Sequence, residues 1–140
     1  MKTLTGLFIV CCGLVVIKAS MTEEQKQAFQ KLLKNCAEKE KASQADIDDF
    51  LARTPAVEPQ AKCFRACLHE TLGSMKNNKF SREGFLAKVD ITFEGDAEKI
   101  KIANEVADTC ANEEDSDRCE AGAKICKCLI ETSRAKGLIE

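Results

Sequence analysis

Apolar positions recur along this chain with the spacing of α-helices. In an amphipathic helix apolar side chains fall three and four residues apart, whereas a half-buried strand alternates with a period of two. No stretch of this sequence alternates in that way. The first helical segment starts at Thr22–Gln25, which has the form of a capping box. Its apolar stripe consists of Ala28, Phe29, Leu32, Leu33 and Cys36.

Start and stop signals divide the rest of the first half into two helices. Ser43 can cap a short second helix, which ends at Thr54 because a residue before proline is pushed out of the helical region. Pro59 suits the first turn of a third helix, and Gly73 suits its end. The apolar residues of these two helices are Ile47, Phe50, Leu51, Phe64, Leu68 and Leu72.

The second half of the sequence predicts three more helices. Ser81 and Asp96 can cap the fourth and fifth, which a break over residues 92–95 separates, and a sixth runs from about residue 118 to about residue 133. Residues 76–79 are expected to form a polar loop. Residues 113–117 form an acidic turn that lacks the ligand spacing of an EF-hand calcium site. We therefore predict an all-α fold of six short helices in one compact domain.

The N-terminal residues have the order of a secretory signal. Lys2 is followed by an apolar run over Leu4–Ile17 and then by the small residues Ala19 and Ser20. This run has fourteen residues, whereas a membrane-spanning helix needs about 20. We predict a signal peptide over residues 1–19, cleavage after Ala19, and a secreted, extracellular domain over residues 20–140.

The charge of the mature domain limits its partners. Without Lys2 and Lys18 the 21 basic residues fall to 19 against 23 acidic ones, which gives a formal net charge near −4. Tyr and Trp are absent. An acidic chain without these stacking residues is not expected to bind nucleic acid. Stable membrane association is not expected either, because no later segment is long and apolar enough to span a bilayer.

Cysteines are the strongest chemical signal of the mature domain. Their density in a secreted chain indicates disulfide bonds. Cys63 and Cys67 lie one helical turn apart, where Cβ atoms are about 5–6 Å from each other, too far for a disulfide between them. Cys119 and Cys128 point to opposite sides of the last helix and need different partners. The seven cysteines are Cys36, Cys63, Cys67, Cys110, Cys119, Cys126 and Cys128.

Without Cys126, the spacing of these cysteines is C-x26-C-x3-C-x42-C-x8-C-x8-C. Together with the signal peptide and the helical pattern, it resembles the insect pheromone-binding and general odorant-binding proteins. The resemblance covers essentially all of the mature chain. It implies the pairing Cys36–Cys67, Cys63–Cys119 and Cys110–Cys128, and an apolar cavity between the helices.

Cys126 departs from the six-cysteine pattern. We expect it to be a buried thiol that acts as a small hydrophobic residue, with an intermolecular disulfide as the alternative. A zinc site with Cys128 and His69 is not expected, because the chain has one histidine and an oxidising compartment favours disulfides. No metal and no cofactor are predicted.

Catalytic motifs are missing from the sequence. It contains no nucleophile elbow, phosphate-binding loop or zinc-protease helix. His69 is followed by Glu70, which does not match the His-Asp pair of small secreted phospholipases. We expect His69 to be a partly exposed helix residue, with a pH-sensing role as the alternative. We therefore predict no catalytic residue and no enzymatic activity.

The resemblance implies a carrier of odorants, pheromones or similar lipid-like molecules. Such a carrier would act as a monomer or weak homodimer and could deliver its ligand to a membrane receptor. The predicted ligand-binding residues lie on the apolar stripes, although each of them could instead belong to a packed core. They are Leu33, Leu72, Met75, Phe80, Phe85, Val89, Val106, Ile125 and Leu129.

The C-terminal tail, residues 137–140, adds two residues to this set. Leu138 and Ile139 are expected to form part of the wall or a lid of the cavity, with a frayed end as the alternative. Whether acid loosens or tightens the tail depends on the charges around it, which the sequence does not specify.

A second class of function stays open at this point. Saposin-like and antimicrobial proteins are also helical, secreted and rich in disulfides. The acidic charge and the missing Trp and Tyr count against a protein that acts on membranes. Vesicle leakage would distinguish it from a carrier.

Overall fold

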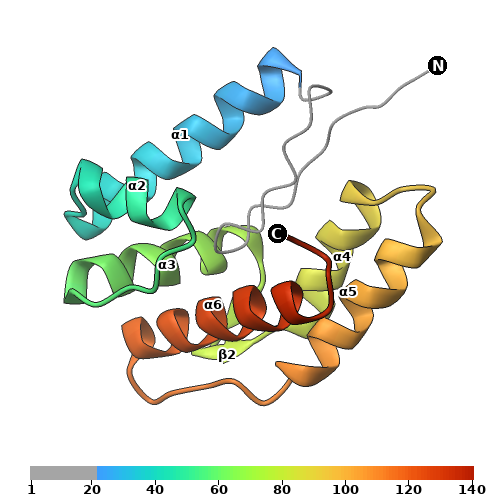
Figure 1. Ribbon diagram of the computed structural model, residues 1–140. Coiled ribbons are helices and arrows are strands. Elements are labelled where there is room, and N and C mark those ends of the chain that lie inside the picture. Colours follow the sequence, from blue (N-terminus) through green and yellow to red (C-terminus); the bar gives the residue numbers. More distant parts are fainter. Residues whose placement is uncertain (1–21) are drawn as a thin grey trace.

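The computed structural model describes residues 22–140, so the predicted signal peptide lies outside the described residues. The described part contains six helices and a two-stranded hairpin, which lies beside α6 (Figure 1). This confirms the all-α prediction in its main elements. In chain order the elements are α1 Glu23–Glu40, α2 Gln44–Leu51, α3 Pro59–Leu72, β1 Met75–Lys76, β2 Lys79–Phe80, α4 Arg82–Thr92, α5 Ala97–Thr109 and α6 Arg118–Ala135.

The helices begin where the capping residues predict. The Thr22 side chain accepts from the main chain of Gln25 while the Gln25 side chain bonds back to Thr22, which completes the capping box of α1. Ser43 and Asp46 form the same arrangement at α2. Gly73 ends α3 with φ of 86°, a left-handed conformation in which glycine carries no Cβ penalty. Local side-chain chemistry therefore sets these helix ends.

The expectation of a plain polar loop over residues 76–79 is wrong. Met75 pairs with Phe80 and Lys76 with Lys79 in an antiparallel hairpin. Asn77 and Asn78 form the turn with φ values of 52° and 62°, as a tight hairpin turn requires, and asparagine tolerates such values well. Each strand has only two residues, which is too short to show the alternation of apolar and polar positions that marks a strand in a sequence.

Helices α3 and α6 pack closely side by side near the centre of the domain (Figure 1). The close approach depends on Gly122, because a Cβ there would lie 2.6 Å from both Cα and N of Ala66. Helix α1 packs on α3, and α4 packs on α5, which in turn contacts α6. The α3–α6 pair is therefore the frame to which the other helices attach. Helix α6 also extends two residues beyond the predicted end.

Three disulfides between described residues connect these helices, and they are the three pairs that the family resemblance implied. Cys36–Cys67 joins α1 to α3, Cys63–Cys119 joins α3 to α6, and Cys110–Cys128 joins the end of α5 to α6. The two bonds of α6 leave it toward different partners, as its helical geometry required. In the chain-entropy picture each of these loops can contribute about 3–4 kcal/mol by restricting the unfolded chain.

Candidate functional site

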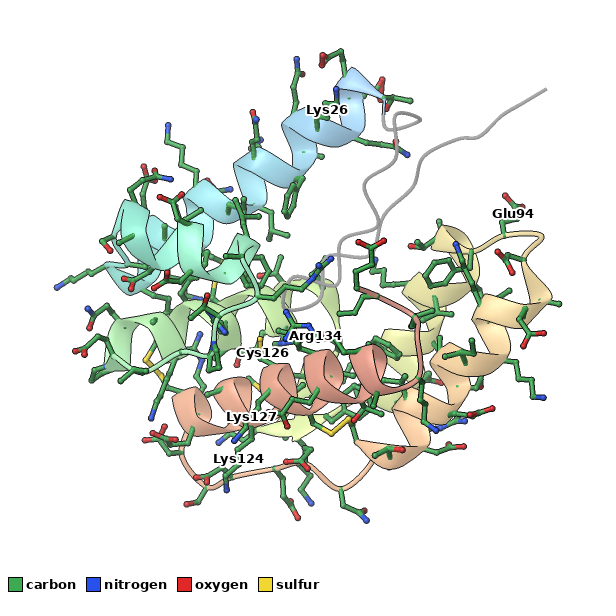
Figure 2. All side chains as sticks on the ribbon, in the orientation of Figure 1. Lys26, Glu94, Lys124, Cys126, Lys127 and Arg134 are labelled. Atoms are coloured by element: carbon green, nitrogen blue, oxygen red, sulfur yellow. A yellow bond between two sulfur atoms is a disulfide. The ribbon has the colours of Figure 1, made fainter. Side chains whose placement is uncertain are left out.

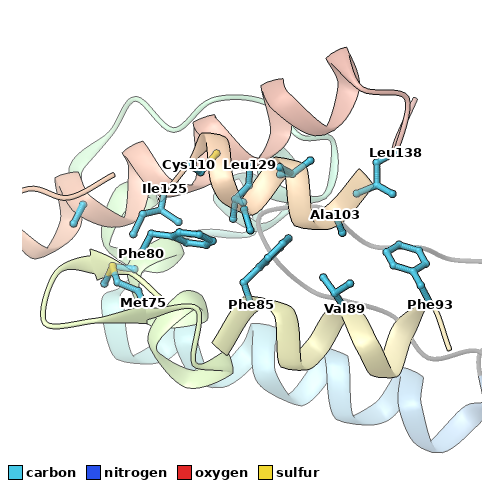
Figure 3. Close-up of a cluster of buried hydrophobic side chains, with 14 residues drawn as sticks. Met75, Phe80, Phe85, Val89, Phe93, Ala103, Cys110, Ile125, Leu129 and Leu138 are labelled. Carbon is cyan, nitrogen blue, oxygen red and sulfur yellow. The ribbon is translucent and has the colours of Figure 1, made fainter. Parts of the chain in front are cut away.

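The largest group of buried apolar side chains, the first apolar cluster, lies between the hairpin, α4, α5 and α6 (Figure 3). It contains no charged side chain. Phe80 and Phe85 pack with ring centres 5.6 Å apart, and Val89, Val106, Ile125 and Leu129 are completely buried around them. The members are Ala66, Met75, Phe80, Phe85, Val89, Phe93, Ala103, Val106, Ala107, Cys110, Ala121, Ile125, Leu129 and Leu138.

The structure brings eight of the eleven predicted ligand-binding residues together in this cluster. Leu33 instead belongs to a second apolar cluster, and Leu72 packs against that cluster while remaining half-buried. Ile139 packs against both clusters. The role of all eleven residues as a ligand-binding wall stays a prediction. The second apolar cluster consists of Phe29, Leu33, Cys36, Ala37, Phe50, Phe64, Cys67, Leu68, Cys126 and Ile130.

Phe93 is a buried member that the sequence reasoning missed. It is 4 % exposed and caps the end of α4, in the segment predicted as a break between helices. A single aromatic residue outside a helical stripe gives no periodic signal, so its burial depends on how α4 and α5 pack. Ala28 and Leu51, by contrast, were placed on apolar stripes but are exposed.

The C-terminal tail folds back on α6, so the frayed-end alternative is wrong. Leu138 is 8 % exposed within the first apolar cluster, and the main-chain N–H groups of Leu138 and Ile139 donate to the Ser133 carbonyl. Arg134 Nε donates to a main-chain oxygen of Glu140 at 3.3 Å. Burial and Arg134 lower the pKa of Arg53, while Glu140 acts in the opposite direction. The negative end of the tail therefore lies near two cations, Arg134 and Arg53.

His69 is not the partly exposed residue that the sequence suggested. It is completely buried on α3, and its Nδ1 lies 2.7 Å from the Ser74 hydroxyl. Burial, and secondly the charge of Arg65, lower the pKa of His69 to about 3. The helical pattern failed here because α3 is covered by neighbours over most of its circumference, including positions that an amphipathic helix would leave in water.

Arg65 is a second polar residue that sequence reasoning missed. An arginine within a helix is normally expected at the surface, yet Arg65 is 2 % exposed. Cys126, which is completely buried as predicted, lies beside it with Sγ at 3.7 Å from Arg65 Nη1. The free thiol at Cys126 stays a prediction.

Two surface recesses are also present in the described part of the chain. One, of about 280 Å³, lies among residues 53–56, α3 and α6, and another, of about 540 Å³, lies along α6 and residues 112–114. Both are lined largely by charged or polar side chains, and none of the predicted ligand-binding residues lines either of them. A site for an apolar ligand at the first apolar cluster is therefore distinct from these recesses.

The described residues also define what chemistry the site can perform. No three His, Cys, Asp or Glu side chains of residues 22–140 are grouped as metal ligands. No helix within the same range is long and apolar enough to cross a membrane. The first apolar cluster itself consists of apolar side chains only.

Comparison with known proteins identifies the family. A sequence profile of the PBP/GOBP family matches residues 18–132. The chain is 29 % identical to general odorant-binding protein 28a of Drosophila melanogaster over 94 % of this chain and 96 % of that protein. It is 27 % identical to general odorant-binding protein 19d of the same fly, over 93 % and 87 % of the two chains.

Solved structures agree with these sequence matches. The Drosophila melanogaster odorant-binding protein dmelOBP28a aligns with a TM-score of 0.72 and 28 % identity, over 84 % of this chain and 98 % of that one. The fatty acid binding protein OBP56a from the oral disk of the blowfly Phormia regina aligns with a TM-score of 0.65 and 26 % identity, over 86 % and 99 %. The chain belongs to the PBP/GOBP family, the insect pheromone-binding and general odorant-binding proteins, which are carriers and not enzymes.

Proposed function

We propose that this chain is a secreted carrier that holds one small apolar molecule among the side chains of the first apolar cluster. The observation that carries the proposal is the composition of this cluster, which combines fourteen buried residues without a charged group. Contact with such side chains removes apolar ligand surface from water, which stabilises a complex by about 25 cal/mol per Å².

The relatives support the chemical class of the ligand. Two of them are named as odorant-binding proteins and a third as a fatty acid binding protein. Odorants and fatty acids share a largely hydrocarbon body, so we infer that the ligand is an apolar alcohol, ester or fatty acid. We further infer that the carrier works as a monomer or weak homodimer, and that transfer to a membrane receptor would follow release.

The test is binding and displacement of an apolar fluorescent probe by the mature, tag-free protein. We expect one saturable site with a Kd of roughly 1 μM, which corresponds to about 8 kcal/mol, and displacement by long-chain alcohols, esters or fatty acids. Because the chain has no Trp or Tyr, probe emission can be read without intrinsic fluorescence from those residues. Absence of any displaceable binding in the fully oxidised protein would refute the proposal.

A matched pair of variants locates the site. Val89 is completely buried in the first apolar cluster, whereas Val57 is 75 % exposed. Val89→Phe should weaken probe binding at least fivefold because the added ring occupies cluster volume, and Val57→Phe should leave it unchanged. Helicity measured by circular dichroism controls for folding. Vesicle leakage provides the second control, since a carrier should bind apolar ligands without releasing vesicle contents.

A further inference from the structure

The smaller of the two recesses has a charge opposite to that of the whole chain. Six cationic and two acidic side chains line it, although the chain has more acidic than basic residues. Figure 2 shows three of the cations along α6, namely Lys124, Lys127 and Arg134. The other three are Arg53, Lys62 and Arg65, and the two carboxylates belong to Glu120 and Glu131.

Some of these cations have carboxylate partners. Lys62 Nζ lies 2.9 Å from Glu120 Oε2, and Lys124 Nζ lies 2.7 Å from Asp115 Oδ2. Lys127 makes no ion pair within 4.0 Å in the described part of the chain. The recess therefore keeps an excess of positive charge after its own ion pairs are considered.

Arg65 is the least compensated of the buried groups at this recess. Its Nε and Nη2 atoms are buried and have no hydrogen-bond partner among the described residues. Nη1 lies 3.7 Å from Cys126 Sγ, and the guanidinium carbon lies 5.8 Å from the centre of the Phe50 ring. Asp46 and Asp49 attract the charge electrostatically, but neither forms an ion pair with it within 4.0 Å.

The two unpartnered nitrogens form one edge of the guanidinium group. Arginine keeps its charge in proteins, and a buried guanidinium without acceptors is unfavourable. The edge formed by Nε and Nη2 presents two parallel N–H donors, the geometry that a carboxylate accepts with both oxygens. Arg65 itself lines the recess, together with the apolar residues Pro55, Ala56, Ala123 and Ile130, so charge and apolar surface meet in the same recess.

We propose that this recess binds a small organic carboxylate, as a second site separate from the first apolar cluster. The carboxylate oxygens accept from Nε and Nη2 of Arg65, Lys127 adds a cation at the entrance, and a short hydrocarbon chain packs on Ile130 and Pro55. The volume of about 280 Å³ lies near the lower limit for small-molecule pockets, so a short chain fits better than a long one.

The test is a titration of the mature, tag-free protein with hexanoate, followed by amide NMR shifts. The interior site is first saturated with the fluorescent probe, so that hexanoate is read at the recess alone. We expect saturable shifts around Arg65 and Lys127 without release of the probe, and loss of the shifts at high salt. Hexan-1-ol, which has the same chain without the charge, should produce no shifts at the recess.

Variants make the assignment specific. Arg65→Met should weaken hexanoate binding at least tenfold, and Lys127→Gln about threefold, because the first removes both donors and the second only an entrance charge. Lys26→Gln, on α1 away from the recess (Figure 2), is the matched control and should bind as the parent does. If Arg65→Met does not fold, the exposed double variant Lys127→Gln with Arg134→Gln takes its place, and it should weaken binding about tenfold.

Three results would overturn the proposal. They are non-saturating shifts, equal binding by all variants, and binding of inorganic phosphate in the absence of hexanoate binding, which would assign the recess to phosphate groups. Failure at this site leaves probe displacement in the interior unaffected, so the two proposals are judged separately.

Discussion

The burial of His69 predicts a specific loss of stability in weak acid. His69 is completely buried and its pKa falls from the ordinary value of 6.5 to about 3, first because of burial and then because of Arg65. In the unfolded chain the same side chain regains its ordinary pKa. Between these two values the unfolded state binds a proton that the folded state does not, so stability decreases as pH falls below about 6.5.

The magnitude follows from the two pKa values. Well below pH 6.5 each pH unit costs about 1.4 kcal/mol, and the change is smaller near pH 7, where the unfolded side chain is only partly protonated. Between pH 7 and pH 5 the free energy of unfolding should therefore decrease by about 2 kcal/mol. His69 is the only histidine, so no other side chain has its ordinary pKa inside this window.

Urea unfolding of the oxidised, tag-free protein at pH 5, 6 and 7, followed by far-ultraviolet circular dichroism, measures this decrease directly. The matched variant is His69→Gln, which does not titrate and keeps an amide near the Ser74 hydroxyl. We expect the free energy of unfolding of this variant to change by less than about 0.5 kcal/mol between pH 7 and pH 5, because the variant lacks the side chain that binds the proton on unfolding. This expectation holds even if the variant is less stable than the parent at every pH. Equal pH dependence in both proteins would refute the assignment to His69.

Three further predictions concern the frame, its ion pairs and the tail. Gly122→Ala should lower the free energy of unfolding, measured in urea, by about 1–3 kcal/mol, because the new Cβ would lie 2.6 Å from the Ala66 backbone. Unchanged stability would contradict the tight α3–α6 contact. Arg118→Gln removes contacts of 2.7 Å to Glu40 and 2.9 Å to Glu70 and should cost about 1 kcal/mol, an effect that 1 M NaCl should largely remove. Deleting residues 137–140 should change the probe dissociation rate several-fold in stopped-flow measurements with helicity retained, and an unchanged rate would show that the tail is no lid.

The sequence allowed the helix starts and the disulfides to be predicted because both depend on few residues. A capping residue such as Ser43 needs only main-chain donors of its own helix, and these are always present. The cysteine spacing resembled a known family, and helix geometry alone had already excluded a bond between Cys63 and Cys67. Local chemistry therefore predicted the helix starts, and the family resemblance predicted the disulfide pairing.

The sequence did not predict which polar side chains are buried. His69 and Arg65 lie on α3, and their burial depends on the elements that pack against α3. These include α1 and also α6, which is far away in the sequence. The hairpin at residues 75–80 was not predicted, because strands of two residues are too short to show an alternation of apolar and polar side chains. These features depend on tertiary packing, which outweighs the local pattern at the centre of a small domain.

The central claim is that an apolar ligand lies among the side chains of the first apolar cluster. Intermolecular NOEs between a bound long-chain alcohol and methyl groups of the isotope-labelled protein test it most directly. We expect contacts to Val89, Ile125 and Leu129, which are completely buried in this cluster. Contacts confined to the exposed Val57 and Ile91, or no NOEs from a saturating ligand, would contradict the account.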